Sequence, residues 1–199
     1  AGSVRPNDHY TLNLLERINL SEILMLIEQK KYFILHAPRQ TGKTSSLLAL
    51  RDYLNNEGKY HCVYVNVEDA QTAREDIDRA VKTILSELNQ ELRLSHNNLL
   101  QFFPEYFDLI GKIPADNLLS YVLSNFSINL DKPLILFIDE IDALGGDSLI
   151  SVLRQLRSGY KNRPAGFPQT VILCGVRDVQ DYRIHSSKEK TIITGGSAF

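Results

Sequence analysis

Residues 37–44, which read A-P-R-Q-T-G-K-T, constrain the fold of this chain more than any other segment. An apolar run at 32–36 precedes them, and a helix-like stretch at 45–50 follows them. A strand, a short loop ending in Gly-Lys-Thr and a helix form the arrangement that holds a nucleotide's phosphates. In it the loop N–H groups converge on phosphate oxygens, and the helix N-terminus adds partial positive charge. The segment therefore predicts a nucleoside triphosphate site.

The residue types within this loop suggest separate roles. Lys43 is placed to reach the β- and γ-phosphates, and the Thr44 hydroxyl to ligate Mg²⁺. Pro38 has no N–H to donate, so the phosphate cradle depends mainly on residues 40–45. Ala37 stands where the strict pattern has glycine, which is tolerable if φ is negative there. The alternative is a surface loop that merely contains Gly-Lys-Thr. The predicted nucleotide-binding residues of the loop are Ala37, Pro38, Arg39, Gln40, Thr41, Gly42, Lys43, Thr44 and Ser45.

A second informative segment is the continuous apolar run at 134–138, which ends in D-E-I-D at 139–142. Such a strand needs cover on both faces, as in the middle of a parallel sheet. Carboxylates at its end are costly unless a cation lies there, and Mg²⁺ with a triphosphate supplies one. Asp139 would then hold the metal, directly or through a water, and Glu140 would act as general base on the attacking water. A strand that ends in a solvated acidic turn is the alternative.

Together the two segments resemble the Walker A and Walker B motifs of P-loop NTPases. The Asp-Glu pair is typical of the ASCE branch, which carries a catalytic glutamate on that strand. Within this branch "H-A-P-R-Q-T-G-K-T" and "F-I-D-E-I-D" are similar to AAA+ and STAND-type ATPases, and the resemblance covers about residues 8–177. It implies ATP as substrate, ADP as product, Mg²⁺ as cofactor, and hydrolysis coupled to conformational change in a larger protein. A nucleotide-dependent switch or binding module with little hydrolysis is the alternative.

The resemblance also suggests roles for residues outside the two motifs. In the STAND group an arginine just after the strand predicted at 170–176 senses the γ-phosphate, and Arg177 matches that place. The alternative is that Arg177 snorkels or pairs with Asp178 or Asp181. Tyr10 either stacks on adenine or packs on the core. Self-association or another protein partner is also implied. Three arginines are candidates for an arginine finger that acts on a neighbouring subunit: Arg154, Arg157 and Arg163. The alternative is that these side chains are simply solvated.

Composition fits one cytoplasmic α/β domain. The 199 residues suffice for one sizeable core. With 22 basic and 24 acidic residues the net charge is −2, which argues against nucleic-acid binding as the main task. Two cysteines within apolar runs are predicted as core residues. No stretch of eighteen apolar residues occurs, so we expect no membrane partner.

Alternating strand and helix patterns predict a three-layer α/β/α sandwich around a mostly parallel sheet. Residues 1–30 are expected to form an N-terminal segment and a helix packed on the core, and residues 31–182 the ATPase core. A helix is expected at 148–160, with Asp147 or Ser148 as its N-cap. Family members continue into a fifth strand and a helical lid. We expect both to be missing here, residues 183–199 to be poorly ordered, and turnover to be slow without the lid.

Overall fold

The fold is described from a computed structural model, for residues 15, 18–36 and 41–175. In this part of the chain a parallel sheet has the strand order β1-β4-β3-β2. The strands are β1 (Phe33–His36), β2 (His61–Asn66), β3 (Leu134–Asp139) and β4 (Thr170–Gly175). The expected α/β fold with a parallel central sheet is confirmed.

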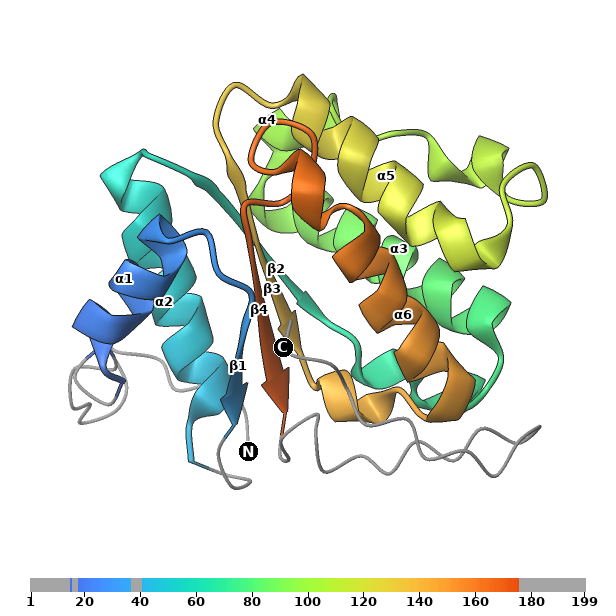
Figure 1. Cartoon of the computed structure of the whole chain (residues 1–199), viewed down its shortest axis with the longest axis horizontal. Helices are drawn as coiled ribbons and strands as arrows, with labels where there is room; N and C mark the ends of the chain where they lie inside the picture. Colours follow the sequence, from blue (N-terminus) through green and yellow to red (C-terminus); the bar gives the residue numbers. More distant parts are fainter. Residues whose placement is uncertain (1–14, 16–17, 37–40, 176–199) are drawn as a thin grey trace.

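Helices cover both faces of the sheet (Figure 1). The helix that follows β1, α2 (Lys43–Glu57), packs with α1 (Leu20–Glu28) on one face. The other face carries α3 (Ile77–Ser95), α5 (Ala115–Asn129) and α6 (Gly146–Ser158), with the short α4 (Asn97–Leu100) after α3. Short 3₁₀ turns connect these elements: η2 (Glu68–Ala73), η3 (Tyr106–Leu109), η4 (Ile141–Ala143) and η5 (Tyr160–Asn162). Within the described ranges, no helix has the length and apolar character that crossing a bilayer requires.

The two central strands explain the apolar runs of the sequence. Every residue of β3 and β4 is buried, because helices pack on both sides of them. Successive side chains alternate between the two faces. In β3, Ile135 and Phe137 join the core beneath α1 and α2, whereas Leu136 and Ile138 join the core beneath α3, α5 and α6. The same alternation directs Asp139 toward the α2 face.

Two glycines in the left-handed region bound α2. Gly42 is its N-cap at φ 81°, and Gly58 follows its last residue at φ 72°. Side chains other than glycine adopt such angles at a cost, so both positions favour glycine. The helix-like stretch expected at 45–50 therefore lies within α2, between these two glycines.

The expected N-cap of α6 is wrong. The helix begins at Gly146, and its N-cap is Gly145, which has an extended backbone. The Gly145 carbonyl accepts the first helical hydrogen bonds, from the N–H groups of Ser148 and Leu149. Ser148 is the third residue of the helix, within its first turn, and is fully buried. Glycines can start a helix without a side-chain cap, a case that polar capping preferences do not identify.

The outer edge of β2 is protected by a side chain of α2. The Asn55 amide donates to the carbonyl of Cys62 (3.0 Å) and accepts from its N–H (2.9 Å). An ion pair between Arg51 of α2 and Glu91 of α3 (3.0 Å) links helices from the two faces of the sheet. The edge strand thus has its outward backbone groups occupied at Cys62, which limits pairing with another chain.

Candidate functional site

The start of α2 has the properties of an anion site. Gly42 provides no side chain to bond the first helical N–H groups, and the first turn, all of it described, contains no acidic residue. The positive end of a 15-residue helix is therefore not balanced by a carboxylate of its own first turn. Thr41 is exposed beside it, and Lys43, Thr44 and Ser45 are half-buried. Several predicted site residues lie outside the described ranges: Tyr10, Ala37, Pro38, Arg39, Gln40 and Arg177.

Asp139, the last residue of β3, meets this helix start. The Thr44 hydroxyl donates to Asp139 Oδ2 at 2.7 Å. The aspartate is fully buried, at 0% exposure. The structure thus brings the Gly-Lys-Thr segment and the acidic strand end together at the carboxyl edge of the sheet. The reason is that β3 and α2 pack on the same apolar core.

Asp139 accepts two further hydrogen bonds. Tyr64 of β2 donates its hydroxyl to the same Oδ2 at 3.0 Å, and the Glu140 N–H donates to Oδ1 at 2.9 Å. Cys174 of β4 lies beside it, and burial, followed by the Asp139 charge, raises the pKa of the Cys174 thiol. Sequence reasoning missed Tyr64, because a tyrosine within an apolar strand has no local feature that identifies its partner.

Glu140 has an unusual backbone conformation. Its φ is 55° and its ψ 40°, in the left-handed region that few residues other than glycine adopt. Burial and then the charges of Asp139 and Asp142 raise the pKa of Glu140, while Lys43 lowers it. The charge of Lys43 also lowers the pKa of Cys174, so it acts on side chains at the ends of both β3 and β4. Hydrogen bonds join Thr44 and the Glu140 N–H to Asp139, and the charge of Lys43 acts on Glu140 in the same region.

The acidic turn after β3 packs closely against the end of β4. A Cβ added at Gly175 would lie 2.6 Å from Asp142 Oδ1, so only glycine leaves room there. Among the described residues, no three His, Cys, Asp or Glu side chains are arranged to hold a metal ion by themselves. A site with few protein ligands suits Mg²⁺, because this ion keeps several waters and binds through one or two protein groups together with substrate phosphates. The Thr44 hydroxyl and the Asp139 carboxylate are the groups that would hold it.

Arg163 has a structural role at the opposite edge of the sheet. Its guanidinium lies 3.3 Å from the centre of the Tyr160 ring and 4.9 Å from that of Tyr32. It donates to the carbonyls of Tyr160 (2.7 Å), Gln169 (3.0 Å) and Lys30. With Nε and Nη1 engaged in this way, Arg163 is tied to the fold, which argues against a role as an arginine finger. Arg154 and Arg157 are exposed on α6.

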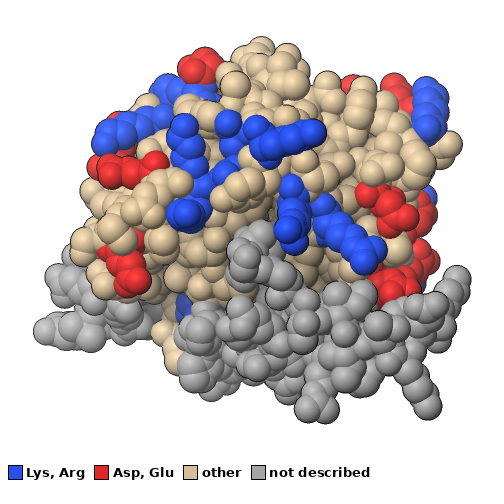
Figure 2. All heavy atoms as spheres, in the orientation of Figure 1, with Lys and Arg blue, Asp and Glu red and all other residues tan. Residues whose placement is uncertain are grey.

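Charge is unevenly distributed over the face of the molecule seen in Figure 2, which spans the α1 side and the α6 side of the sheet. Lys and Arg side chains lie over its middle, and Asp and Glu gather toward its two sides (Figure 2). Arg154, Arg157 and Lys161 are exposed on α6 and the turn after it. The net charge of −2 therefore hides a local basic excess.

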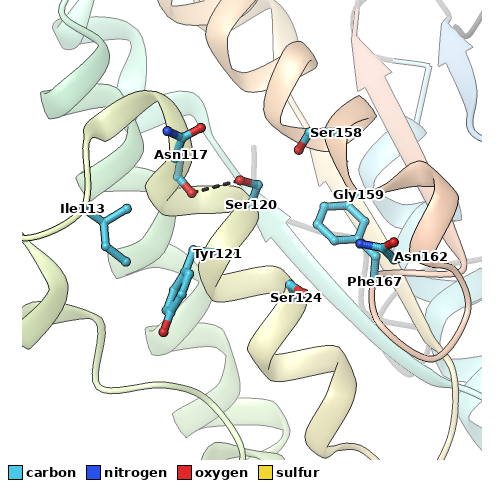
Figure 3. Close-up of a pocket in the computed structure, with 9 residues that line it drawn as sticks. All are labelled: Ile113, Asn117, Ser120, Tyr121, Ser124, Ser158, Gly159, Asn162 and Phe167. Atoms are coloured by element: carbon cyan, nitrogen blue, oxygen red, sulfur yellow. Dashed lines mark hydrogen bonds between the residues drawn. The ribbon is translucent and has the colours of Figure 1, made fainter.

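A separate pocket lies between α5 and the segment after α6 (Figure 3). Its volume is about 290 Å³, and hydroxyl and amide side chains such as Asn117, Ser120 and Ser124 line it with the ring of Phe167. None of its lining residues is Lys or Arg. It therefore offers no cationic group for a triphosphate, in contrast to the Lys43 site.

Comparison with known proteins identifies the family. The AAA-like domain family matches residues 14–164, three quarters of the chain. The chain belongs to the AAA-like domain family. Among curated proteins, none matches this AAA-like domain at a significant level. Its fold is similar to that of Cdc6p from Pyrobaculum aerophilum, with a TM-score of 0.52 and 19% identity over 84% of this chain. The matched region is 41% of the Cdc6p chain, so this AAA-like domain spans less than half the length of that protein. The likeness places the chain in the α/β P-loop NTPase fold.

Proposed function

We propose that this AAA-like domain binds Mg·ATP at the carboxyl edge of its sheet and hydrolyses it. The observation that carries the proposal is the 2.7 Å hydrogen bond between Thr44 and Asp139. It joins the first turn of the helix after the phosphate loop to the end of the buried acidic strand. A surface loop and a solvated acidic turn, the alternatives from sequence, have no reason to meet in this way.

Each residue of the site would contribute a distinct interaction. The α2 N-terminus and the Lys43 ammonium would bind the phosphates, and Thr44 with Asp139 would hold Mg²⁺. Bound Mg²⁺ would offset the charge that develops on the phosphates. Residues 37–40 would complete the phosphate cradle, Tyr10 would stack on adenine, and Arg177 would sense the γ-phosphate.

Glu140 would orient and deprotonate the attacking water. Burial and neighbouring carboxylates raise the pKa of Glu140, which makes the carboxylate a stronger base than an exposed glutamate. Lys43 moderates this shift and keeps the charged form accessible. The Glu140 N–H donates to Asp139 Oδ1, which fixes the Glu140 backbone relative to the carboxylate that would hold the metal.

Two variants test the proposal. Lys43→Ala should weaken ATP binding at least about 100-fold by removing the phosphate-binding charge, whereas Lys82→Ala, at an exposed helix position, should leave it unchanged. Glu140→Gln should keep ATP binding and lower turnover by about 10²–10⁴-fold. If Lys43→Ala binds ATP normally, the site is wrong. If Glu140→Gln turns over at the wild-type rate, Glu140 is not the base. If the wild type binds ATP without turnover, the domain acts as a nucleotide-dependent switch.

We further propose that residues 31–182 form the ATPase core of a larger STAND-like protein, in which the nucleotide state controls a protein partner or self-association. The free, buried Cys62 and Cys174 fit a reducing compartment such as the cytoplasm. Turnover per molecule measured against protein concentration tests whether Arg154 or Arg157 acts on a neighbouring subunit. A value that stays flat over a wide concentration range argues against such action.

A further inference from the structure

Tyr64 places a hydroxyl in an otherwise apolar region of the core. It lies on β2 opposite Phe137 of β3 and is 8% exposed. Its ring packs in the cluster formed by the faces of β2, β3 and β4 that meet α1 and α2, with Cys62 and Phe137 among its members. A phenylalanine would fill this space equally well. The hydroxyl donates to Asp139 Oδ2 at 3.0 Å, and the Asn66 side chain lies beside it.

The Asp139 carboxylate is held by donors from separate parts of the fold. Thr44 on α2 and Tyr64 on β2 both donate to Oδ2, and the Glu140 N–H donates to Oδ1. A carboxylate offers about four lone-pair directions, so these three donors leave it little rotational freedom. Thr44 belongs to the helix that would itself contact the nucleotide. Tyr64 of β2 is the hydroxyl donor that belongs to the sheet, and the Cys174 thiol of β4 also lies against the carboxylate.

We propose that Tyr64 is a positioning residue that orients the Asp139 carboxylate toward Thr44 and so couples Mg²⁺ binding to nucleotide binding. The inference rests on the proposed function, because it concerns the same site. Without the tyrosine hydroxyl, Oδ2 loses its donor from β2, and the carboxylate can turn away from Thr44. Groups that orient a metal-binding residue typically change metal affinity by about 10- to 100-fold when they are removed.

The test is Tyr64→Phe, which keeps the ring and removes one hydroxyl. The affinity for a fluorescent ATP analogue is measured with excess Mg²⁺ and again with EDTA. The dissociation constant in EDTA divided by that in Mg²⁺ reports how strongly Mg²⁺ binding and nucleotide binding are coupled. We expect Tyr64→Phe to reduce this ratio about 10-fold. The affinity in EDTA should stay within about twofold of the wild type, because Tyr64 touches no group that contacts phosphate directly.

Tyr32→Phe is the matched control. Tyr32 is also buried, at 7% exposure, and donates its hydroxyl to the carbonyl of Pro168 at 3.0 Å, at the amino edge of the sheet. Each variant loses one buried hydroxyl, so a general loss of stability would affect them alike. Only Tyr64→Phe should change the coupling ratio.

A second measurement covers the case of a weakened fold. The Mg²⁺ concentration that gives half of the nucleotide-dependent increase in melting temperature should rise about 10-fold in Tyr64→Phe. In Tyr32→Phe it should match the wild type. Wild-type coupling that persists in Tyr64→Phe overturns the role of Tyr64 and leaves the nucleotide site intact. A wild-type protein that binds no nucleotide overturns both.

Discussion

The side chains of Thr44 and Asp139, 95 positions apart in the sequence, are joined by a hydrogen bond of 2.7 Å. Thr44 belongs to the first turn of α2, and Asp139 is the last residue of β3. A buried carboxylate without a cation requires such donors, since an unpaired buried charge is strongly unfavourable. The same pair would hold Mg²⁺ when nucleotide binds, so one contact serves both the fold and the proposed chemistry.

Thr44→Val should separate the hydroxyl from the shape of this side chain. Valine keeps the branched volume but cannot donate to Asp139 or ligate a metal. We expect a loss of about 1–3 kcal/mol in the free energy of unfolding, and at least about 10-fold weaker ATP binding in Mg²⁺. Equilibrium urea denaturation and nucleotide titration measure the two effects. Thr44→Ser keeps the hydroxyl and should retain Mg²⁺-dependent binding; equal binding by the valine and serine variants would contradict the role of the hydroxyl.

Glu140→Gln should stabilise the protein in the absence of nucleotide at pH 7. Burial and the charges of Asp139 and Asp142 raise the pKa of Glu140, which means that the folded state disfavours its charged form. A neutral glutamine removes this cost. We expect the melting temperature to rise by about 1–2 °C in a thermal unfolding experiment, with no rise for Glu105→Gln at an exposed position. A lower melting temperature for Glu140→Gln would show that the charge is stabilising.

Asn55→Ala should open the outer edge of β2. Both hydrogen bonds of the Asn55 amide to Cys62 are lost, and two partly buried backbone groups lose their partner. We expect a loss of about 1–3 kcal/mol in the free energy of unfolding and faster hydrogen exchange at the Cys62 amide. Asn129→Ala is the control, because its amide makes an exposed bond to the carbonyl of Asn125. Similar small losses in both variants would argue against edge protection by Asn55.

Gly159→Ala should be poorly tolerated at the end of α6. A Cβ at this position would lie 2.1 Å from the Phe167 ring, which is itself buried, so the ring must move. The expected cost is about 1–3 kcal/mol in the free energy of unfolding, measured by urea denaturation. Gly145→Ser is the control, because nothing lies within 4 Å of an added Cβ there and serine is a favoured N-cap. A neutral Gly159→Ala would mean that Phe167 can shift freely.

Arg163→Ala should lower stability and leave catalysis alone. The substitution removes a cation stacked on two tyrosine rings and hydrogen bonds to three carbonyls. We expect a loss of about 1–3 kcal/mol, with turnover per folded molecule within about twofold of the wild type. Arg157→Ala, at an exposed position on α6, should change stability by less than about 0.5 kcal/mol. Loss of turnover without loss of stability in Arg163→Ala would restore its candidacy as an arginine finger.

Some features follow from the sequence because their causes are local. The apolar run at 134–138 predicts a strand covered on both faces, and the structure confirms this for β3. Gly42 and Gly58 mark the limits of α2, because left-handed backbone favours glycine wherever it occurs. The predicted N-cap of α6 is wrong because a glycine N-cap has no polar side chain that would identify it in the sequence.

Tertiary structure alone decided how the site is enclosed. The strand order β1-β4-β3-β2 places β4 between β1 and β3, and nothing in an apolar run specifies its neighbours. The hydrogen bond from Tyr64 to Asp139 depends on that order, because it joins β2 to β3. The stacking of Arg163 on Tyr160 depends on how the segment after α6 packs at the amino edge of the sheet. Periodicity and capping act over a few residues, so they determine elements, whereas contacts between distant side chains depend on the packing of the whole sheet with its helices.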